Sequence, residues 1–272
     1  EQSIETICPG CGQEIDPDTC GCGDPRLDSR GRSLSHEGHP FIPYGCNCYR
    51  SPSSLDLDPR VLDRDPLPLK PRFTPKELRN LALVDQAIPE SIRTRGNTLG
   101  SYEEYEEYEE RTAYCKDKAW AVPCSAAIAR IVELGPIVEM GAGTGYWAKW
   151  IDQCGGDIIA FDENPRGNEW CNDSFHFNVN KGSFEKLSKN RTRSLFLCWP
   201  PYNTSFAADC LKAYLGNTII FVGEGRGGCT GDDEFFEMLD GKNWVEYGDT
   251  VRIPQWSGIH DYLFVYRRAV PI

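Results

Sequence analysis

Long apolar runs are missing from this sequence of 272 residues, and basic residues are outnumbered by acidic ones, 29 to 41. No stretch reaches the roughly 20 consecutive apolar residues of a membrane-spanning helix, and no N-terminal stretch resembles a signal peptide. We therefore expect a cytoplasmic protein without a membrane partner. The net charge of −12 also disfavours non-specific coating of nucleic acid, although a local basic face would remain compatible with that partner.

Cysteine, by contrast, is abundant, with 13 residues. The odd number excludes a fully paired disulfide framework. Six of the cysteines lie before residue 50 in close pairs, whereas the other seven are scattered singly, as is typical of small buried apolar side chains. In a reducing compartment, close cysteine pairs indicate metal ligands rather than disulfides.

Four close pairs of soft ligands lie within residues 1–50. Zinc takes four such ligands in a tetrahedron, and a close pair places two of them on one turn. Eight ligands predict two structural zinc ions, with one ion and leftover ligands as the alternative; sequential and cross-braced pairings both fit. Such a module would stabilise a segment that is poor in aliphatic residues and could provide a recognition surface. The predicted zinc ligands are Cys8, Cys11, Cys20, Cys22, His36, His39, Cys46 and Cys48.

Proline spacing marks the segment that follows. Six prolines between residues 51 and 75 exclude a helix and predict an extended linker. Residues 76–118 are expected to form a helical connector. Its first helix is indicated by Thr74, which precedes Pro75 and stands three positions before Glu77, because this arrangement is the signature of a capping box.

A second helix of the connector is expected from Ser101. Tyr102, Tyr105 and Tyr108 recur at a spacing of three between glutamate pairs. The pattern predicts one packed face that carries the tyrosines and one solvated acidic face. An acidic docking surface is the alternative interpretation.

Residues 119–272 show a different pattern, in which short apolar stretches alternate with amphipathic ones. This alternation predicts a parallel sheet with helices on both faces. The last two apolar stretches are joined only by a loop, which predicts an antiparallel pair at the sheet edge. The expected strands are Ile137–Met140, Asp157–Phe161, Phe175–Val179, Ser194–Cys198, Thr218–Val222, Asn243–Thr250 and Tyr262–Arg267. The expected helices include Trp147–Gln153, Ser205–Leu215 and Asp233–Leu239.

The first of these strands runs straight into a glycine loop. Gly141, Gly143 and Gly145 allow the backbone to turn tightly and to approach a ligand closely. A dinucleotide-binding loop would place its third glycine one position later, where Tyr146 stands. The acid Glu139, two residues before the loop, suits a ligand that carries an ammonium group.

Two further features follow later strands. Asp162 ends the second strand, 17 residues after Gly145, where a carboxylate can accept both hydroxyls of a ribose; a helix cap or turn acid is the alternative. The fourth strand ends in Trp199, Pro200, Pro201 and Tyr202. Prolines fix the backbone and can present a carbonyl and an aromatic face in set positions, although an ordinary turn would also explain them.

The motifs WAVP (Trp120–Pro123), EMGAGTGYWA, FDENP, LCWPPY, VGEG and IPQWSGIHDYLFVYRR together resemble class I S-adenosylmethionine-dependent methyltransferases, and among them a poorly characterised bacterial and phage group. The resemblance covers roughly residues 119–268. It implies a Rossmann-like α/β fold with a seven-stranded sheet, mostly parallel with an antiparallel last strand, and S-adenosylmethionine as cofactor. The implied cofactor-binding residues are Glu139, Gly141, Ala142, Gly143, Gly145, Tyr146 and Asp162, with Trp120 and Pro123 beside the methionine part.

The resemblance also implies a reactive loop at Trp199, Pro200 and Tyr202. Enzymes that methylate amino groups usually carry Asp, Asn or Ser before the two prolines, whereas the indole N–H of Trp199 can only donate. The carbonyl of Trp199 or Pro200 could still accept a hydrogen from an amine, and Tyr202 could stack on a planar acceptor. Glu224 and His260 are candidates for the acceptor side, with structural hydrogen bonds as the alternative. Glu224 follows the fifth strand, at the carboxyl edge of the sheet where ligands bind, whereas His260 is expected near the opposite edge.

Three functions are compatible with these features. The leading hypothesis is a methyltransferase whose zinc module helps to select a macromolecular acceptor, with nucleic acid as a candidate. The second is a small-molecule or protein methyltransferase. The third is a catalytically silent protein that uses the fold to bind partners, because a fold does not fix its function.

Overall fold

A computed structural model describes residues 73–94, 101–165 and 167–270, with the side chains of the second range beginning at Glu107. The eight predicted zinc ligands and most of the predicted linker lie outside these ranges, so the zinc module and its ligand pairing remain predictions. Within the described ranges, histidine, cysteine, aspartate and glutamate side chains form no group of three or more that could hold a metal ion. No helix in these ranges is both long and apolar enough to cross a membrane.

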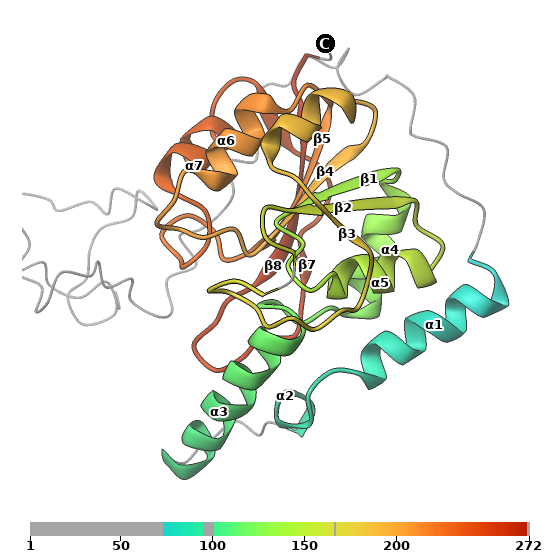
Figure 1. The fold of residues 1–272 in the computed structure, drawn as a ribbon, viewed down its shortest axis with the longest axis vertical. Coiled ribbons are helices and arrows are strands. Elements are labelled where there is room, and N and C mark those ends of the chain that lie inside the picture. Colours follow the sequence, from blue (N-terminus) through green and yellow to red (C-terminus); the bar gives the residue numbers. More distant parts are fainter. Residues whose placement is uncertain (1–72, 95–100, 166, 271–272) are drawn as a thin grey trace, which may run out of the picture. The chain divides into compact units, whose positions relative to one another are not determined.

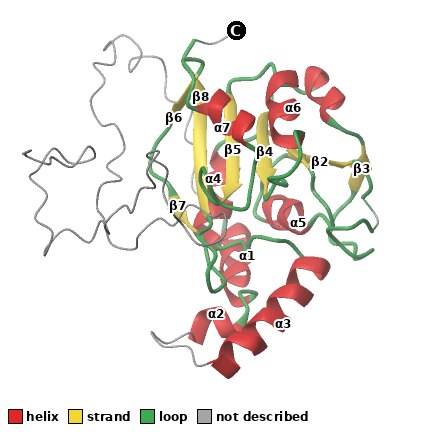
Figure 2. Cartoon of the chain, turned by 90° about the vertical axis from the view of Figure 1, so that its left-hand side faces the viewer, coloured by secondary structure: helices red, strands yellow, loops and turns green. Residues whose placement is uncertain are grey.

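A single sheet of eight strands organises the described part of the chain (Figure 2). The strand order is β3-β2-β1-β4-β5-β8-β6, with β7 paired to β8 outside this path. The first five strands in this order, β3, β2, β1, β4 and β5, are all parallel. β8 runs antiparallel to β5, β6 and β7. The predicted mostly parallel Rossmann-like sheet with a reversed strand is therefore confirmed. The strands are β1 Ile137–Met140, β2 Ile158–Asp162, β3 Val179–Lys181, β4 Ser194–Cys198, β5 Thr218–Gly223, β6 Trp244–Glu246, β7 Val251–Arg252 and β8 Tyr262–Arg268.

The number of strands exceeds the seven that the resemblance implied. The extra strand is β7, whose two residues pair with Leu263 and Tyr262 at the beginning of β8. The antiparallel closing pair is present as expected, but β6 is shorter than the stretch Asn243–Thr250. The additional pairing involves only the first two residues of β8.

The third expected strand, Phe175–Val179, is misplaced. β3 begins only at the last residue of that stretch, and Phe175 is 66 % exposed. The backbone N–H of His176 donates to the Thr144 carbonyl (3.0 Å), and a ring nitrogen of His176 lies 2.9 Å from the Asp117 carbonyl. The segment is thus tied to the glycine loop and to the long helix α3 (Ser101–Asp117), a long-range effect that local periodicity does not report.

Helices cover both faces of the sheet and create two hydrophobic clusters (Figure 1). Along β5, Ile220 and Val222 belong to the cluster with α1, α4 and α5, whereas Ile219 and Phe221 belong to the cluster with α6 and α7. This alternation follows from the two-residue period of a strand. The helices are α1 Pro75–Gln86, α2 Glu90–Thr94, α3 Ser101–Asp117, α4 Ser125–Glu133, α5 Tyr146–Gln153, α6 Phe206–Ala213 and α7 Asp233–Leu239, with a 3-10 helix, η2, at Phe184–Lys189.

The capping box predicted for α1 is confirmed. The N–H of Glu77 donates to the Thr74 hydroxyl at 3.3 Å, and the N–H of Thr74 donates to the Glu77 carboxylate at 2.7 Å. Two of the free N–H groups at the helix start are thereby satisfied.

The packed face of α3 differs from the predicted one. Tyr108 is 60 % exposed, whereas Glu107 is only 5 % exposed; the side chains of Tyr102 and Tyr105 lie outside the described residues. Glu107 accepts the backbone N–H of Ser257 at 2.7 Å. A carboxylate that satisfies a loop N–H is thus buried in place of the Tyr108 ring, and α3 is anchored to the segment between β7 and β8.

Candidate cofactor and acceptor site

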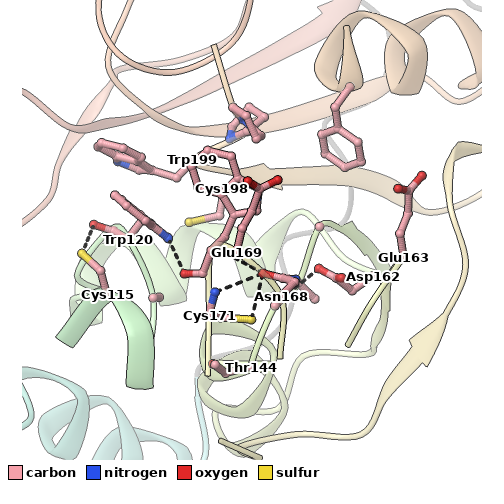
Figure 3. A pocket seen from close by; sticks show the side chains of 18 of the residues that line it. Cys115, Trp120, Thr144, Asp162, Glu163, Asn168, Glu169, Cys171, Cys198 and Trp199 are labelled. Atoms are coloured by element: carbon pink, nitrogen blue, oxygen red, sulfur yellow. Dashed lines mark hydrogen bonds between the residues drawn. The ribbon is translucent and has the colours of Figure 1, made fainter. Parts of the chain in front are cut away.

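A cavity of about 940 Å³ opens where β1, β2 and β4 end (Figure 3). Ligands of open α/β sheets bind in the crevice outside the carboxyl ends of the strands, and the volume falls within the usual range for small-molecule sites. Most of the residues predicted from sequence meet here. Those that line the cavity are Trp120, Glu139, Gly141, Ala142, Gly143, Tyr146, Asp162, Trp199, Pro200 and Tyr202. Gly145, Pro123, Glu224 and His260 are outside its lining.

The glycine loop adopts the backbone conformation for which glycine is suited. Gly141, Gly143 and Gly145 have φ angles of 73°, 51° and 79°, in the left-handed region that other residues avoid. Gly143 faces the cavity, but a Cβ on Gly145 would lie 2.8 Å from Cβ of Phe177. Gly145 therefore allows the loop to pack against the segment before β3 and does not contact the cavity.

Gly145→Ala is expected to destabilise the fold by ~3 kcal/mol, the sum of left-handed strain and overpacking. Gly227→Ala is a matched control, because Gly227 has a φ of 85° with nothing within 4 Å of its Cβ position, and only the strain of about 1 kcal/mol should appear. Urea denaturation of both variants measures the difference. Equal losses would contradict the close packing at Gly145.

Glu139 is a buried carboxyl group at the end of β1. It is 2 % exposed, and its Oε2 atom has no hydrogen-bond partner among the described residues. Burial, followed by the nearby charge of Asp162, raises the pKa of Glu139 to about 8. A buried carboxylate of this kind is unfavourable unless a cation or hydrogen-bond donor compensates it, so the site fits a positively charged ligand group.

Asp162 stands at the end of β2 and is held by two backbone groups. Its Oδ2 accepts the N–H of Gly143 at 2.9 Å, and its Oδ1 accepts the N–H of Asn164 at 2.8 Å. The carboxylate thereby connects the glycine loop to the loop after β2. Because each carboxylate oxygen can accept more than one hydrogen bond, capacity remains for ligand hydroxyls.

Trp199 has an unusual backbone at the end of β4. Its φ is 52°, a positive value that no other non-glycine residue in the described ranges adopts. Bulky residues in this region are strained, and such strain is often found at functional sites. The Trp199 N–H donates to the Val222 carbonyl at 2.8 Å, and the indole N–H donates to Asp261 Oδ1 at 2.8 Å. The indole N–H is therefore already used in a hydrogen bond within the protein.

Two indoles form one wall of the cavity. The rings of Trp120 and Trp199 stack with centroids 5.2 Å apart and an interplanar angle of 24°. Trp120 also donates its indole N–H to the Trp170 carbonyl at 3.1 Å. Figure 3 shows Trp120 and Trp199 on one side of the cavity, and Asp162 and Glu163 on the other.

Glu224 and His260 meet outside the cavity lining. Glu224 accepts the N–H of His260 at 2.9 Å and the N–H of Cys229 at 2.8 Å. These contacts agree with the alternative interpretation, in which Glu224 makes structural hydrogen bonds. The expected location of His260 near the opposite edge is wrong. Because β8 is antiparallel to β5, the residues just before β8 lie beside Gly223, where β5 ends.

Asp261 is a site residue that the sequence did not indicate. It is 1 % exposed, and burial raises its pKa to about 7, whereas the hydrogen bond from Trp199 lowers it. Its position before β8 became informative only once the direction of that strand was known. The same holds for Arg111 on α3 and Trp170, which line the cavity from segments without a recognisable motif.

Asp261→Asn is expected to flatten the dependence of stability on pH. The folded-state pKa of about 7 lies above the ordinary 3.8, so the native state binds more protons between these values. The contribution of Asp261 to the stability of the wild type should be greatest below pH 4 and should fall as the pH rises to 7. Thermal denaturation between pH 4 and 8 would show this loss in the wild type and a smaller one in the variant; parallel curves would contradict the burial effect.

Neither a protein-family model nor a curated protein matches this sequence. Among solved structures, magnesium protoporphyrin IX methyltransferase (ChlM) from Synechocystis PCC 6803 with bound SAM is similar over 70 % of this chain and 97 % of its own, with 8 % identity and a TM-score of 0.38. Human N-acetylserotonin methyltransferase (ASMT) in complex with SAM covers 72 % and 67 %, with 12 % identity and a TM-score of 0.33. A variant of MtNAS in complex with S-adenosylmethionine covers 71 % and 71 %, with 12 % identity and a TM-score of 0.37. Such weak similarities carry no argument about function.

Proposed function

We propose that this chain is a class I S-adenosylmethionine-dependent methyltransferase. The Glu139 carboxyl group supports the proposal most strongly, because it is buried at the cavity with one oxygen that lacks a partner among the described residues. An ammonium group would compensate such a carboxylate. The methionine part of the cofactor carries an ammonium group at one end and the sulfonium that bears the methyl group at the other.

The other cofactor roles follow from the same cavity. Asp162 would accept the two ribose hydroxyls, and the backbone of Gly141 and Gly143 would allow the ligand to approach closely. Trp120 would border the methionine part. Pro123 is buried outside the cavity lining, so we propose for it only a supporting position behind Trp120.

Methyl transfer requires positioning more than a strong base. When bound, the cofactor would supply an electrophilic methyl group on a sulfonium. The Pro200 carbonyl already accepts the N–H of Gly231 at 2.8 Å, so we assign the orientation of an acceptor hydrogen to the Trp199 carbonyl. Tyr202 lines the cavity and is 58 % exposed, which leaves its ring accessible for stacking on a planar acceptor.

For the acceptor, we propose a macromolecule that is selected with help from the zinc module, with nucleic acid as a candidate. A small-molecule or protein acceptor is the alternative. Two zinc ions per chain by elemental analysis would support the module, and none would remove it. Retention on DNA or RNA that weakens with salt would favour the nucleic acid.

Calorimetric titration with S-adenosylmethionine tests the cofactor assignment. We expect one binding event in the wild-type protein and at least about tenfold weaker binding by Asp162→Ala, a change of ~1.4 kcal/mol. Asp152→Ala, on the exposed side of α5, serves as the control and should bind normally. Wild-type protein that bound neither S-adenosylmethionine nor S-adenosylhomocysteine would favour the catalytically silent alternative.

A further inference from the structure

A guanidinium group that has no anionic partner among the described residues lines the tryptophan side of the cavity. Cζ of Arg111 lies 5.7 Å from the ring centroid of Trp120 and 5.7 Å from that of Trp199. Among the described residues, no ion pair engages this side chain, and its Nε is buried without a hydrogen-bond partner. The two indoles hold the cation by cation–π attraction, and a planar guanidinium keeps N–H groups that can donate to a ligand.

Arg111 contacts both Trp120, which would border the methionine part of the proposed cofactor, and Trp199 in the proposed reactive loop. The two carboxylates proposed to hold the cofactor, Glu139 and Asp162, are at the ends of β1 and β2. Arg111 instead lies against Trp199 at the end of β4, and its charge lowers the pKa of Asp261 and Cys229, which lie near the end of β5. The pKa of Glu139 responds to burial and to Asp162, which is consistent with an Arg111 charge directed away from the ammonium position.

Arg111 is half-buried, and its buried Nε, which has no hydrogen-bond partner among the described residues, costs free energy unless a ligand satisfies it. The chain has 41 acidic residues, yet none within the described ranges forms an ion pair with Arg111. The nearby Asp261 is already engaged by the indole of Trp199. Lys118 also lines this cavity, with its Nζ 4.9 Å from the ring centroid of Tyr114, and adds a second positive charge.

We infer that Arg111 binds an anionic oxygen group, a carboxylate or a phosphate, that the methyl acceptor carries. This inference rests on the proposed function, because it takes the Glu139 side of the cavity to be filled by cofactor. A planar guanidinium matches either group through two parallel N–H···O bonds, a geometry that lysine cannot reproduce. The acceptor would thus be oriented by its anionic group at one end and by the Trp199 loop at the other.

Small anionic probes test the inference on the full chain, with and without saturating S-adenosylhomocysteine. Phenyl phosphate and benzoate distinguish the two anionic sources, and benzyl alcohol is the neutral match. We expect at least one anion to bind measurably by calorimetry, at least tenfold more tightly than benzyl alcohol, with an affinity that falls as salt rises. Binding of all three probes with equal affinity, or of none of them, would overturn the inference.

Substitutions locate the binding group. Arg111→Gln should weaken the preferred anion at least tenfold, and Arg111→Lys should weaken it less. Arg130→Gln is the matched control, because Arg130 also stacks on a ring, that of Tyr247, but is not part of the cavity lining; it should bind normally. Near-ultraviolet circular dichroism confirms that each variant is folded. Unchanged anion binding by a folded Arg111→Gln would refute the role.

Cofactor titrations separate this inference from the proposed function. Arg111→Gln should bind S-adenosylhomocysteine within about twofold of the wild type. If it lost S-adenosylhomocysteine but kept 5′-methylthioadenosine, which lacks the amino acid part, Arg111 would bind the cofactor carboxylate and the acceptor role would be wrong. If wild-type protein bound no cofactor but still bound the anions through Arg111, the methyltransferase proposal alone would fail.

Discussion

Glu139→Gln is expected to weaken S-adenosylmethionine binding by about 100-fold, or ~2.7 kcal/mol, the size of a lost charge-assisted hydrogen bond. The amide has nearly the same shape but no negative charge to compensate the ammonium group. Calorimetric titration at pH 8.5 gives the dissociation constants. Glu237→Gln, an exposed substitution on α7, removes the same charge outside the cavity and should leave binding unchanged.

A comparison of the wild-type protein with Glu139→Gln also tests the burial of this carboxyl group in the absence of cofactor. The pKa of Glu139 is about 8 in the folded protein against an ordinary 4.5, so the native state binds the extra proton between these values. Stability of the free wild-type protein should therefore decrease from pH 4.5 to 8, and Glu139→Gln should lose less over this range. Normal cofactor affinity in Glu139→Gln would remove the main support for the proposed function.

Trp199→Ala should cost roughly 3 kcal/mol of folding stability, because it removes the stacked indole and leaves Asp261 without its donor. Trp199→Gly removes the same side chain but tolerates a φ of 52°, so it should be about 1 kcal/mol more stable than the alanine variant. Urea denaturation of the three proteins gives this order.

The order of these two variants is the informative result. Truncation of a side chain to glycine normally destabilises a protein more than truncation to alanine, because glycine gains backbone freedom in the unfolded chain. A glycine variant less stable than the alanine variant would show that the positive φ is not maintained in solution. Both variants should lose most acceptor turnover, since the reactive loop would no longer be fixed.

Apolar periodicity located much of the sheet because β1 is buried along its whole length and β4 at all residues but its last, Cys198, and the bounds of both match the expected strands. Periodicity failed at β3, whose residues are intermediate or exposed. It also failed on α3, where Glu107 is buried through a bond to distant Ser257. In both places, tertiary contacts outweigh the local pattern.

The candidate site divides in the same way. Glu139 and Asp162 could be anticipated because the carboxyl ends of parallel strands meet at one edge of the sheet. Asp261 could not, since its place depends on the direction of β8. Arg111 could not either, because only the folded chain brings α3 beside the proline loop, and an arginine in a helix gives no local signal.

Among the described residues, the strand that comes latest in the sequence is not at the edge of the sheet. β8 inserts between β5 and β6, and the residue before it, Asp261, fixes the indole of Trp199. While the ribosome synthesises the protein, the side of β5 that receives β8 must wait unpaired, and exposed strand edges are prone to mispairing. The wall of the cavity that Trp199 forms can therefore be fixed only after β8 has been synthesised and has paired with β5.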